Sequence, residues 1–219
     1  MRKIVIAEEL QTYLLEHFQW LHRHPELALK EYETTNYVKN VLKQTEGVEL
    51  LNLGLDTGAL AKIEGKEPGG VVAIRADIDA LPILEESGLS YSSENDGCMH
   101  ACGHDGHASI GLTTAKILME LKEHLHGTLK IIFQPAEEGV RGAKSICESG
   151  FLDDVDYIFA AHIMPRVKDY DLYFGMNESF ATTKLDVIYH GVSTHAAESP
   201  QFGKNALLSA ANCIINLHS

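Results

Sequence analysis

The stretch GVVAIRAD, residues 70–77, is a short apolar run that begins at a glycine and ends on a carboxylate. A run of this length and composition is typical of a buried β-strand. Three further runs are predicted as strands: TGALAKIEG at 57–65, TLKIIFQ at 128–134 and DYIFAAH at 156–162. Helices are predicted over 7–22, 29–45, 107–124 and 140–149. Strands that alternate with helices predict an α/β domain with a largely parallel sheet.

Carboxylate or imidazole side chains follow three of these predicted strands. Asp77 and Asp79 come at the end of the first, Glu137 and Glu138 follow TLKIIFQ, and His162 ends DYIFAAH. Ligands of open α/β sheets bind outside the carboxyl ends of the strands, so we expect these groups to converge on one rim. That convergence is the main argument for a functional site.

A fourth cluster, MHACGHDGH at residues 99–107, holds three His, one Cys and one Asp. Thiolate and imidazole are ligands that borderline divalent metals prefer, so the cluster predicts a metal site. Gly103 and Gly106 would let side chains two positions apart face one point. Accidental clustering and a closed structural zinc site are the alternatives. Mixed Cys, His and carboxylate ligands favour a site that keeps an open coordination position.

The pair Glu137 and Glu138 in PAEEG places two like charges side by side, which is costly unless a cation or free solvent is near. A solvated surface turn is the alternative. Because the pair ends a buried strand, we interpret one carboxylate as a metal ligand and the other as a base that deprotonates the attacking water. His162 is interpreted as a ligand rather than as a packed core histidine because it belongs to the same rim.

The other polar residues of these motifs are assigned supporting roles. Asp77 and Asp79 are expected to orient the ligand imidazoles, with a polar turn as the alternative. His100 and His107 are interpreted as supporting or structural. The remaining histidines outside the motifs are interpreted as solvated or packing side chains: His17, His22, His24, His124, His126, His190 and His218.

The composition excludes several classes of function. The formal net charge of -13 argues against binding to nucleic acid or to an anionic membrane surface. The sequence contains no apolar run long enough to span a bilayer, and its first residues do not form a signal peptide. Four cysteines in a chain of 219 residues do not indicate a disulfide framework. We therefore expect a cytoplasmic protein.

The sequence changes character near residue 184. KLDVIYHG alternates apolar and polar residues, as a half-solvated strand does, and GKNALLSAANCIINLHS predicts an amphipathic helix. One strand and one helix cannot bury a core of their own. We therefore expect a catalytic domain over residues 1–183 and the beginning of a smaller α+β domain over 184–219.

Six segments of the chain resemble the aminoacylase and carboxypeptidase family of two-metal peptidases, peptidase family M20, in its amidohydrolase branch. They run in family order: RHPEL (23–27), RADIDALP (75–82), MHACGHDGH (99–107), FQPAEEG (133–139), AAHIMP (160–165) and GVSTHAAESPQFGKNALLSAA (191–211). The resemblance implies a zinc-peptidase-like catalytic domain, followed by a lid domain through which subunits dimerise. Family members continue past the position of residue 219 and supply another histidine ligand there, so the resemblance implies an incomplete site in these residues.

The same resemblance assigns roles to individual residues. It implies two divalent metal ions, zinc or manganese, with Cys102, His104, Glu138 and His162 at ligand positions. Glu137 matches the general base. The implied reaction is hydrolysis of the amide bond of an N-acyl amino acid, aminobenzoyl-glutamate being one such substrate.

The resemblance also implies how the chains assemble. His195, in STHAA of the lid domain, matches a histidine that stabilises the carbonyl oxygen of the substrate in the site of the partner subunit. The implied partner is a second copy of the chain, or a second related subunit.

Two other functions are compatible with the residues. In the first, Cys102 is a nucleophile and a nearby histidine is its base. In the second, the chain is a non-catalytic metal-binding or regulatory subunit. Removal of metal by a chelator distinguishes the first from a metal-dependent hydrolase, and the metal content of the protein distinguishes the second.

Overall fold

The computed structural model describes residues 7–139, 142–164, 173, 175 and 185–218 of the 219-residue chain. The chain divides into two compact units, Met1–Lys168 and Asp169–Ser219, and each is described by itself. The predicted domain boundary at 183/184 lies outside the described residues. No helix in the described ranges is both long and apolar enough to cross a membrane.

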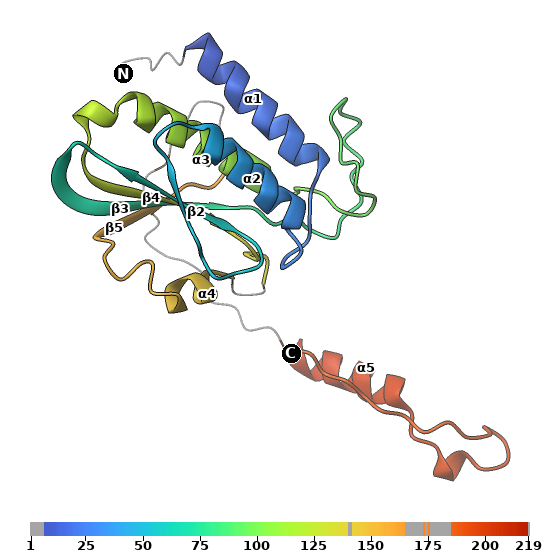
Figure 1. Ribbon diagram of the computed structural model, residues 1–219. Coiled ribbons are helices and arrows are strands. Elements are labelled where there is room, and N and C mark those ends of the chain that lie inside the picture. The colour runs from blue at the N-terminus through green and yellow to red at the C-terminus, as the bar shows by residue number, and fades with distance from the viewer. Residues whose placement is uncertain (1–6, 140–141, 165–172, 174, 176–184, 219) are drawn as a thin grey trace. The chain divides into compact units, whose positions relative to one another are not determined.

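A five-stranded sheet forms the centre of the first unit (Figure 1). Its strands are β1 (Glu49–Leu51), β2 (Ala59–Glu64), β3 (Glu67–Asp77), β4 (His126–Gln134) and β5 (Tyr157–Ala160), in the order β1-β2-β4-β3-β5. β3 is parallel to both β4 and β5, whereas β2 is antiparallel to β1 and β4. Among the described strands, β1, β3, β4 and β5 therefore run in one direction and β2 runs against them, so the prediction of an α/β fold with a largely parallel sheet is confirmed. The connection between β2 and β3 is too short for a parallel crossover, so the chain must reverse there.

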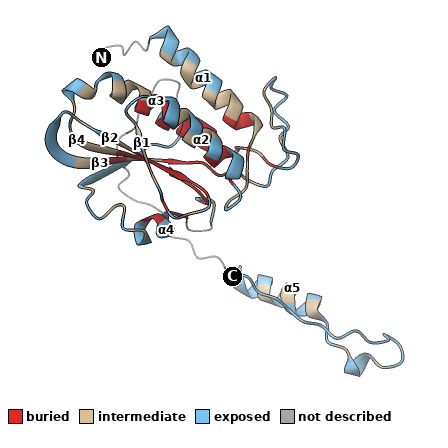
Figure 2. Ribbon diagram, viewed as in Figure 1, coloured by how far each residue is buried: buried red, intermediate tan, exposed pale blue. Residues whose placement is uncertain are grey.

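Helices cover both faces of this sheet (Figure 1). They are α1 (Glu8–Arg23), α2 (Tyr32–Gln44) and α3 (His104–Glu120) on one face and α4 (Gly142–Glu148) on the other. Alternate residues of β2 point to opposite faces. Ala61 and Ile63 pack with Leu42 of α2 and Leu112 of α3, whereas Leu60 packs into the core that contains α4. Figure 2 shows that the buried residues concentrate in the sheet and in α3.

Helix α3 begins earlier than the sequence pattern predicts, at His104 instead of residue 107. Gly103 has a left-handed backbone (φ 82°) and turns the chain into the helix. The second half of the MHACGHDGH cluster is therefore the first turn of α3. A short 3-10 helix, η1 (Lys122–His124), follows α3 where the prediction continued the helix.

The second unit contains a short 3-10 helix, η2 (Pro200–Phe202), and helix α5 (Ala206–Leu217). The Asn205 side chain caps α5 by accepting a hydrogen bond from the backbone N–H of Leu208, at 3.0 Å. The predicted strand over KLDVIYHG is absent from its described residues, 185–191. A strand requires a paired neighbour, and the described part of this unit offers only the bridge between Val192 and Lys204.

Candidate metal centre

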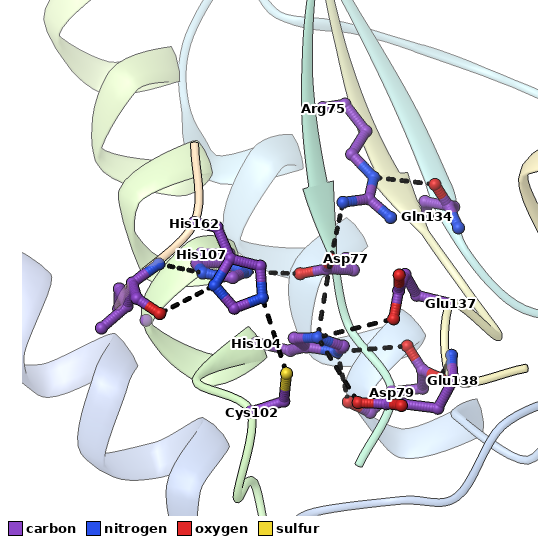
Figure 3. Close-up of polar contacts among 12 residues, drawn as sticks. Arg75, Asp77, Asp79, Cys102, His104, His107, Gln134, Glu137, Glu138 and His162 are labelled. Atoms are coloured by element: carbon purple, nitrogen blue, oxygen red, sulfur yellow. Dashed lines mark hydrogen bonds and ion pairs between the residues drawn. The ribbon is translucent and has the colours of Figure 1, made fainter. Parts of the chain in front are cut away.

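The three parallel strands β3, β4 and β5 end at the same rim of the sheet, and the predicted site residues of the first unit lie there. Asp77 is the last residue of β3, Glu137 and Glu138 follow β4, and His162 lies two residues after β5. Cys102 and His104 reach the same rim from the turn that begins α3 (Figure 3). Three sets of donor atoms gather within 4.8 Å of one another: Cys102, His104 and His162; Asp77, His104 and His107; and His104, Glu137 and Glu138.

His104 belongs to all three sets, and its orientation is fixed from one side. Its Nδ1 donates to the backbone carbonyl of Asp79 at 2.8 Å. The other ring nitrogen, Nε2, then carries the lone pair and faces three carboxylates. The carboxylate oxygens of Asp77, Glu137 and Glu138 lie 3.6, 3.9 and 4.0 Å from it. Within the part of the chain that the structure describes, this buried Nε2 has no hydrogen-bond partner.

The electrostatics around His104 favour a cation at this point. Burial acts to lower the pKa of His104, but the hydrogen bond to Asp79 and the charge of Asp77 outweigh it and raise that pKa. Burial likewise acts to raise the pKa of Asp77, yet the hydrogen bond from His107 and the charges of His104 and Arg75 hold it below its usual value. A buried imidazole among ionised carboxylates is stabilised by a bound proton or by a metal ion.

Cys102 and His162 form a second pair of donors beside His104. The Sγ atom of Cys102 lies 3.5 Å from Nε2 of His162, and Nδ1 of His162 donates to the carbonyl of Ile163 at 2.7 Å. Burial, together with the charges of Glu138 and Glu137, raises the pKa of the Cys102 thiol to about 11. The thiol is therefore protonated near neutral pH unless a metal ion replaces its proton.

These donors fit divalent cations by chemistry and by arrangement. Thiolate, imidazole and carboxylate groups together are the ligands of catalytic zinc sites, and imidazole and carboxylate also accept manganese. His104 Nε2 is the buried polar atom that a cation would satisfy. The Nδ1 atoms of His104 and His162 are held by backbone carbonyl groups, so each Nε2 is the nitrogen that can bind a cation. The family resemblance implies Cys102, His104, Glu138 and His162 as ligands, and that assignment stays a prediction.

His107 lies in the same cluster, but its two ring nitrogens are already used. Nδ1 donates to Oδ1 of Asp77 at 2.6 Å, and Nε2 accepts a hydrogen bond from the backbone N–H of Ile163 at 2.9 Å. The residue next to the metal-ligand candidate His162 is thus fixed by His107. The supporting role expected for His107 and Asp77 has a geometric basis: Asp77 holds His107, which holds the segment after β5 (Figure 3).

Glycine is required at position 106 for a reason other than the backbone turn that the sequence predicted. It lies inside the first turn of α3 with no left-handed backbone. A Cβ atom there would collide with Cδ1 of Ile163, and Gly103 faces the same side chain. Gly106 therefore lets the segment that carries His162 approach α3, rather than bending the cluster.

Asp79 supports the centre in two ways. Its backbone carbonyl accepts the hydrogen bond that orients His104, and its Oδ2 accepts a hydrogen bond from the backbone N–H of Glu138 at 2.9 Å. The loop after β4 also contains Ala136 with a positive φ of 52°. The carboxylate pair is therefore presented by a tightly constrained turn in which Glu138 is half-buried and Glu137 is partly exposed.

The sequence pattern missed a buried cluster beneath the centre. His22 of α1, interpreted as a solvated or packing residue, is buried and contacts Oδ2 of Asp105 at 2.6 Å and Oε1 of Glu85 at 3.2 Å. The hydrogen bond to Asp105 raises the pKa of His22 against the effect of burial. The signal in the sequence is its place four residues after Phe18, on the apolar face of the predicted helix. A histidine there must find polar partners inside the protein.

The last predicted site residue, His195, belongs to the second unit. Its Nδ1 accepts hydrogen bonds from the backbone N–H groups of Ala197 and Glu198, at 3.2 and 3.1 Å. Because Nδ1 is the acceptor, Nε2 carries the proton and is available as a donor. The side chain is exposed within its unit.

Comparison with known proteins agrees with this geometry. Residues 73–213 match the model of the peptidase family M20/M25/M40. The chain is 45% identical over 170 residues to one subunit of the p-aminobenzoyl-glutamate hydrolase of Escherichia coli (strain K12), covering 74% of this chain and 39% of that protein. It is 46% identical over 212 residues to the N-acetylcysteine deacetylase of Bacillus subtilis (strain 168), covering 95% and 55% respectively. The chain spans between 39% and 55% of the length of these relatives.

Solved structures show the same fold. A dinuclear metal-binding peptidase from the M20 family of Bacillus subtilis superimposes with a TM-score of 0.71 at 44% identity, over 74% of this chain and 45% of that one. A putative aminohydrolase from methicillin-resistant Staphylococcus aureus gives a TM-score of 0.68 at 43% identity, over 72% and 40%. The resemblance of the sequence motifs to this family is confirmed.

Proposed function

The chain belongs to the peptidase family M20/M25/M40, and we propose that it acts as a two-metal amidohydrolase on N-acyl amino acids. One observation carries the proposal most directly. The buried Nε2 of His104 lacks a hydrogen-bond partner in the described structure and faces Glu137 and Glu138, while Cys102 and His162 pair beside it. The names of the two relatives, an amide hydrolase and a deacetylase, support the same reaction class.

The proposal gives the two carboxylates different roles. Cys102, His104, Glu138 and His162 hold the cations. Two divalent cations bound there would act as Lewis acids and make water acidic enough to attack at neutral pH. Glu137 takes the proton of the attacking water and passes it to the nitrogen of the leaving amine. Its side chain is partly exposed and faces His104, as this proton transfer requires.

The remaining parts of the reaction are binding and charge stabilisation. His195, donating from Nε2, stabilises the negative charge that develops on the carbonyl oxygen, and one such donor contributes about 3–4 kcal/mol in comparable sites. The proposal places this histidine on a partner subunit, in a homodimer formed through residues 184–219 or with a second related subunit. Its support is the exposure of His195 within its own unit and the run of exposed apolar side chains on α5.

A nucleophilic role for Cys102 has less support. The pair Cys102 and His162 resembles a thiol with its base, at 3.5 Å. A reactive thiolate needs a lowered pKa, however, and the pKa of Cys102 is raised to about 11. The carboxylates that raise it are the groups that make the site suitable for cations.

The finer features follow from the same chemistry. The thiolate ligand favours zinc, and the carboxylate and imidazole ligands also suit manganese. The substrate is an N-acyl amino acid, and aminobenzoyl-glutamate is the first compound to test. All four cysteines are free, which supports a reducing, cytoplasmic location.

The test compares the full-length wild-type protein with its Glu137→Gln variant. Each is loaded with Zn²⁺ or Mn²⁺, its metal content is determined by elemental analysis, and hydrolysis of a panel of N-acyl amino acids is measured. We expect the wild type to hold about two metal ions per chain and to release the free amino acid. Glu137→Gln should keep its metal and lose about 10²–10⁴-fold in kcat. Bound metal without turnover in the wild type would favour a non-catalytic metal-binding subunit, and wild-type turnover by Glu137→Gln would contradict the assigned base.

A further inference from the structure

The segment from Glu26 to Thr35 belongs to no part of the proposed reaction, yet it lies directly against the metal rim. Backbone bridging joins Leu27 to Ala80, the residue after Asp79. Thr35 accepts a hydrogen bond from the backbone N–H of Gly58 at 2.8 Å, at the start of β2. The segment therefore packs between the amino-terminal helices and the strand ends that carry the site.

Glu31 is the residue of this segment that contacts the site loop. Its side chain is fully buried, with 0% relative exposure. Its Oε1 accepts a hydrogen bond from the backbone N–H of Ala136 at 2.8 Å, across 105 positions of sequence. Burial raises the pKa of Glu31, although hydrogen bonds from the backbone of Glu31 and Ala136 oppose the shift. A buried carboxyl group is costly, so its position here calls for a compensating role.

The contact falls on a strained point of the backbone. Ala136 has φ 52°, a left-handed conformation that residues with a Cβ atom rarely adopt. Such conformations persist where surrounding contacts over-determine them, and they cluster at functional sites. The bond from Ala136 to Glu31 is one such contact, and the bond from the Gly142 N–H to the Ala136 carbonyl, at 3.0 Å, is another.

Two buried carboxyl groups thus hold the backbone on either side of Glu137. Glu31 holds the N–H of Ala136, immediately before Glu137, and Asp79 holds the N–H of Glu138, immediately after it. We propose that Glu31 is a positioning residue that fixes the backbone of the Ala136–Glu138 turn and so aims Glu137 and Glu138 at the metal centre. This inference rests on the proposed function, because it assigns Glu138 as a ligand and Glu137 as the base.

This positioning role requires a side chain at position 31 that is long enough to place an acceptor oxygen at the N–H of Ala136. It does not require a negative charge. Glutamine at position 31 keeps an oxygen at the same distance from the N–H of Ala136 while removing the carboxylate. Aspartate keeps the charge, but its side chain is one methylene shorter and cannot reach that N–H without movement of the backbone. The two variants therefore separate the hydrogen bond from the charge.

The experiment measures the affinity of each chain for Zn²⁺ by competition with a chromophoric chelator, and also kcat and KM for N-acyl amino acids. We expect Glu31→Asp to bind Zn²⁺ about 10–100-fold more weakly, as loss of residues that orient metal ligands typically does. Its kcat should fall while its KM stays close to that of the wild type. Glu31→Gln should keep both the Zn²⁺ affinity and the kcat close to those of the wild type. Glu33→Asp and Glu33→Gln are the matched controls, because Glu33 is exposed and two positions away.

Circular dichroism and thermal unfolding establish that each variant is folded at the assay temperature. Glu31→Met, which fills the same space without an acceptor, repeats the comparison if the aspartate variant does not fold. A folded Glu31→Asp or Glu31→Met variant that binds Zn²⁺ as tightly as the wild type contradicts the positioning role. So does a folded Glu31→Gln that loses affinity. Because zinc affinity is measured directly, wild-type zinc binding without amide hydrolysis would overturn the proposed function but leave standing the positioning of the ligand Glu138 by Glu31.

Discussion

The Sγ atom of Cys102 lies 3.5 Å from Nε2 of His162, although sixty positions separate the two residues in the sequence. Two ligands of one tetrahedral zinc ion, at the usual Zn–S and Zn–N bond lengths, stand about 3.5 Å apart. The protein therefore holds this thiol and this imidazole at the separation that a shared ion requires. The arrangement follows from two elements: the turn before α3 carries Cys102, and the segment after β5 carries His162.

The first prediction concerns the reactivity of Cys102 without metal. Because burial and the neighbouring carboxylates raise its pKa to about 11, only about 0.1% of the thiol is ionised at pH 8. After treatment with a chelator, iodoacetamide should label Cys102 more slowly than the exposed Cys147. The rate at Cys102 should rise with pH through pH 10, because the thiolate fraction grows. Peptide mass spectrometry measures both rates, and fast labelling of Cys102 at pH 7 would support a nucleophilic role instead.

The second prediction separates Glu138 from Glu137 by stability. A ligand that binds only the folded chain stabilises it by about 2.7 kcal/mol at a free concentration 100 times its Kd. Zn²⁺ should therefore raise the melting temperature of the wild type and of Glu137→Gln to a similar extent. Glu138→Gln should show a clearly smaller increase, because a ligand oxygen is lost. Thermal unfolding with and without Zn²⁺ measures the difference, and equal increases in all three chains would contradict the assignment of Glu138.

The third prediction tests the contact between His107 and Ile163. Replacing His107 with leucine keeps bulk but removes the hydrogen bonds to Asp77 and to the N–H of Ile163. His162, which directly precedes Ile163, should then be less well positioned. The Zn²⁺ affinity should fall about 10–100-fold. His124→Leu, at an exposed histidine of η1, is the control and should bind as the wild type does. Unchanged affinity in folded His107→Leu would show that this contact does not position the ligand.

The fourth prediction concerns pH and the buried pair His22 and Asp105. The hydrogen bond to Asp105 raises the folded-state pKa of His22 above the usual 6.5. The stabilisation is therefore complete below about pH 6.5 and is lost as pH rises through the folded-state pKa. His22→Gln should lower the free energy of unfolding by about 1.5–3 kcal/mol at pH 6 and by less at pH 9. Urea unfolding at both pH values measures this, with His124→Gln as the exposed control; a larger loss at pH 9 would reverse the assigned sign.

The fifth prediction uses Gly142, at the start of α4. A Cβ atom there would overlap the backbone carbonyl oxygen of Pro135, which cannot move without shifting the turn that carries Glu137 and Glu138. Gly142→Ala should destabilise the chain by about 1–3 kcal/mol, as overpacking does, and should weaken Zn²⁺ binding. Ser145→Ala, on the exposed side of the same helix, should do neither. A Gly142→Ala chain with wild-type stability would mean that the turn adjusts freely.

Much of the candidate site was readable from local patterns. The apolar runs predicted the four longer strands, and the residues after three of them, from Asp77 to His162, predicted the rim. These features are local because a strand's burial and its end are encoded by neighbouring residues. The short strand β1 was missed, since three residues of mixed burial carry almost no periodic signal.

The sequence by itself determined the family and the four longer strands, and it proposed the candidate donor residues, because spacing and residue type are properties of the chain. Tertiary structure alone decided which nitrogen of His104 faces the carboxylates, that both ring nitrogens of His107 are hydrogen-bonded, and that Glu31 holds the N–H of Ala136. These features depend on atoms brought together from positions as far as 105 residues apart. Local periodicity cannot encode such contacts, which arise only when helices and sheet pack into one core.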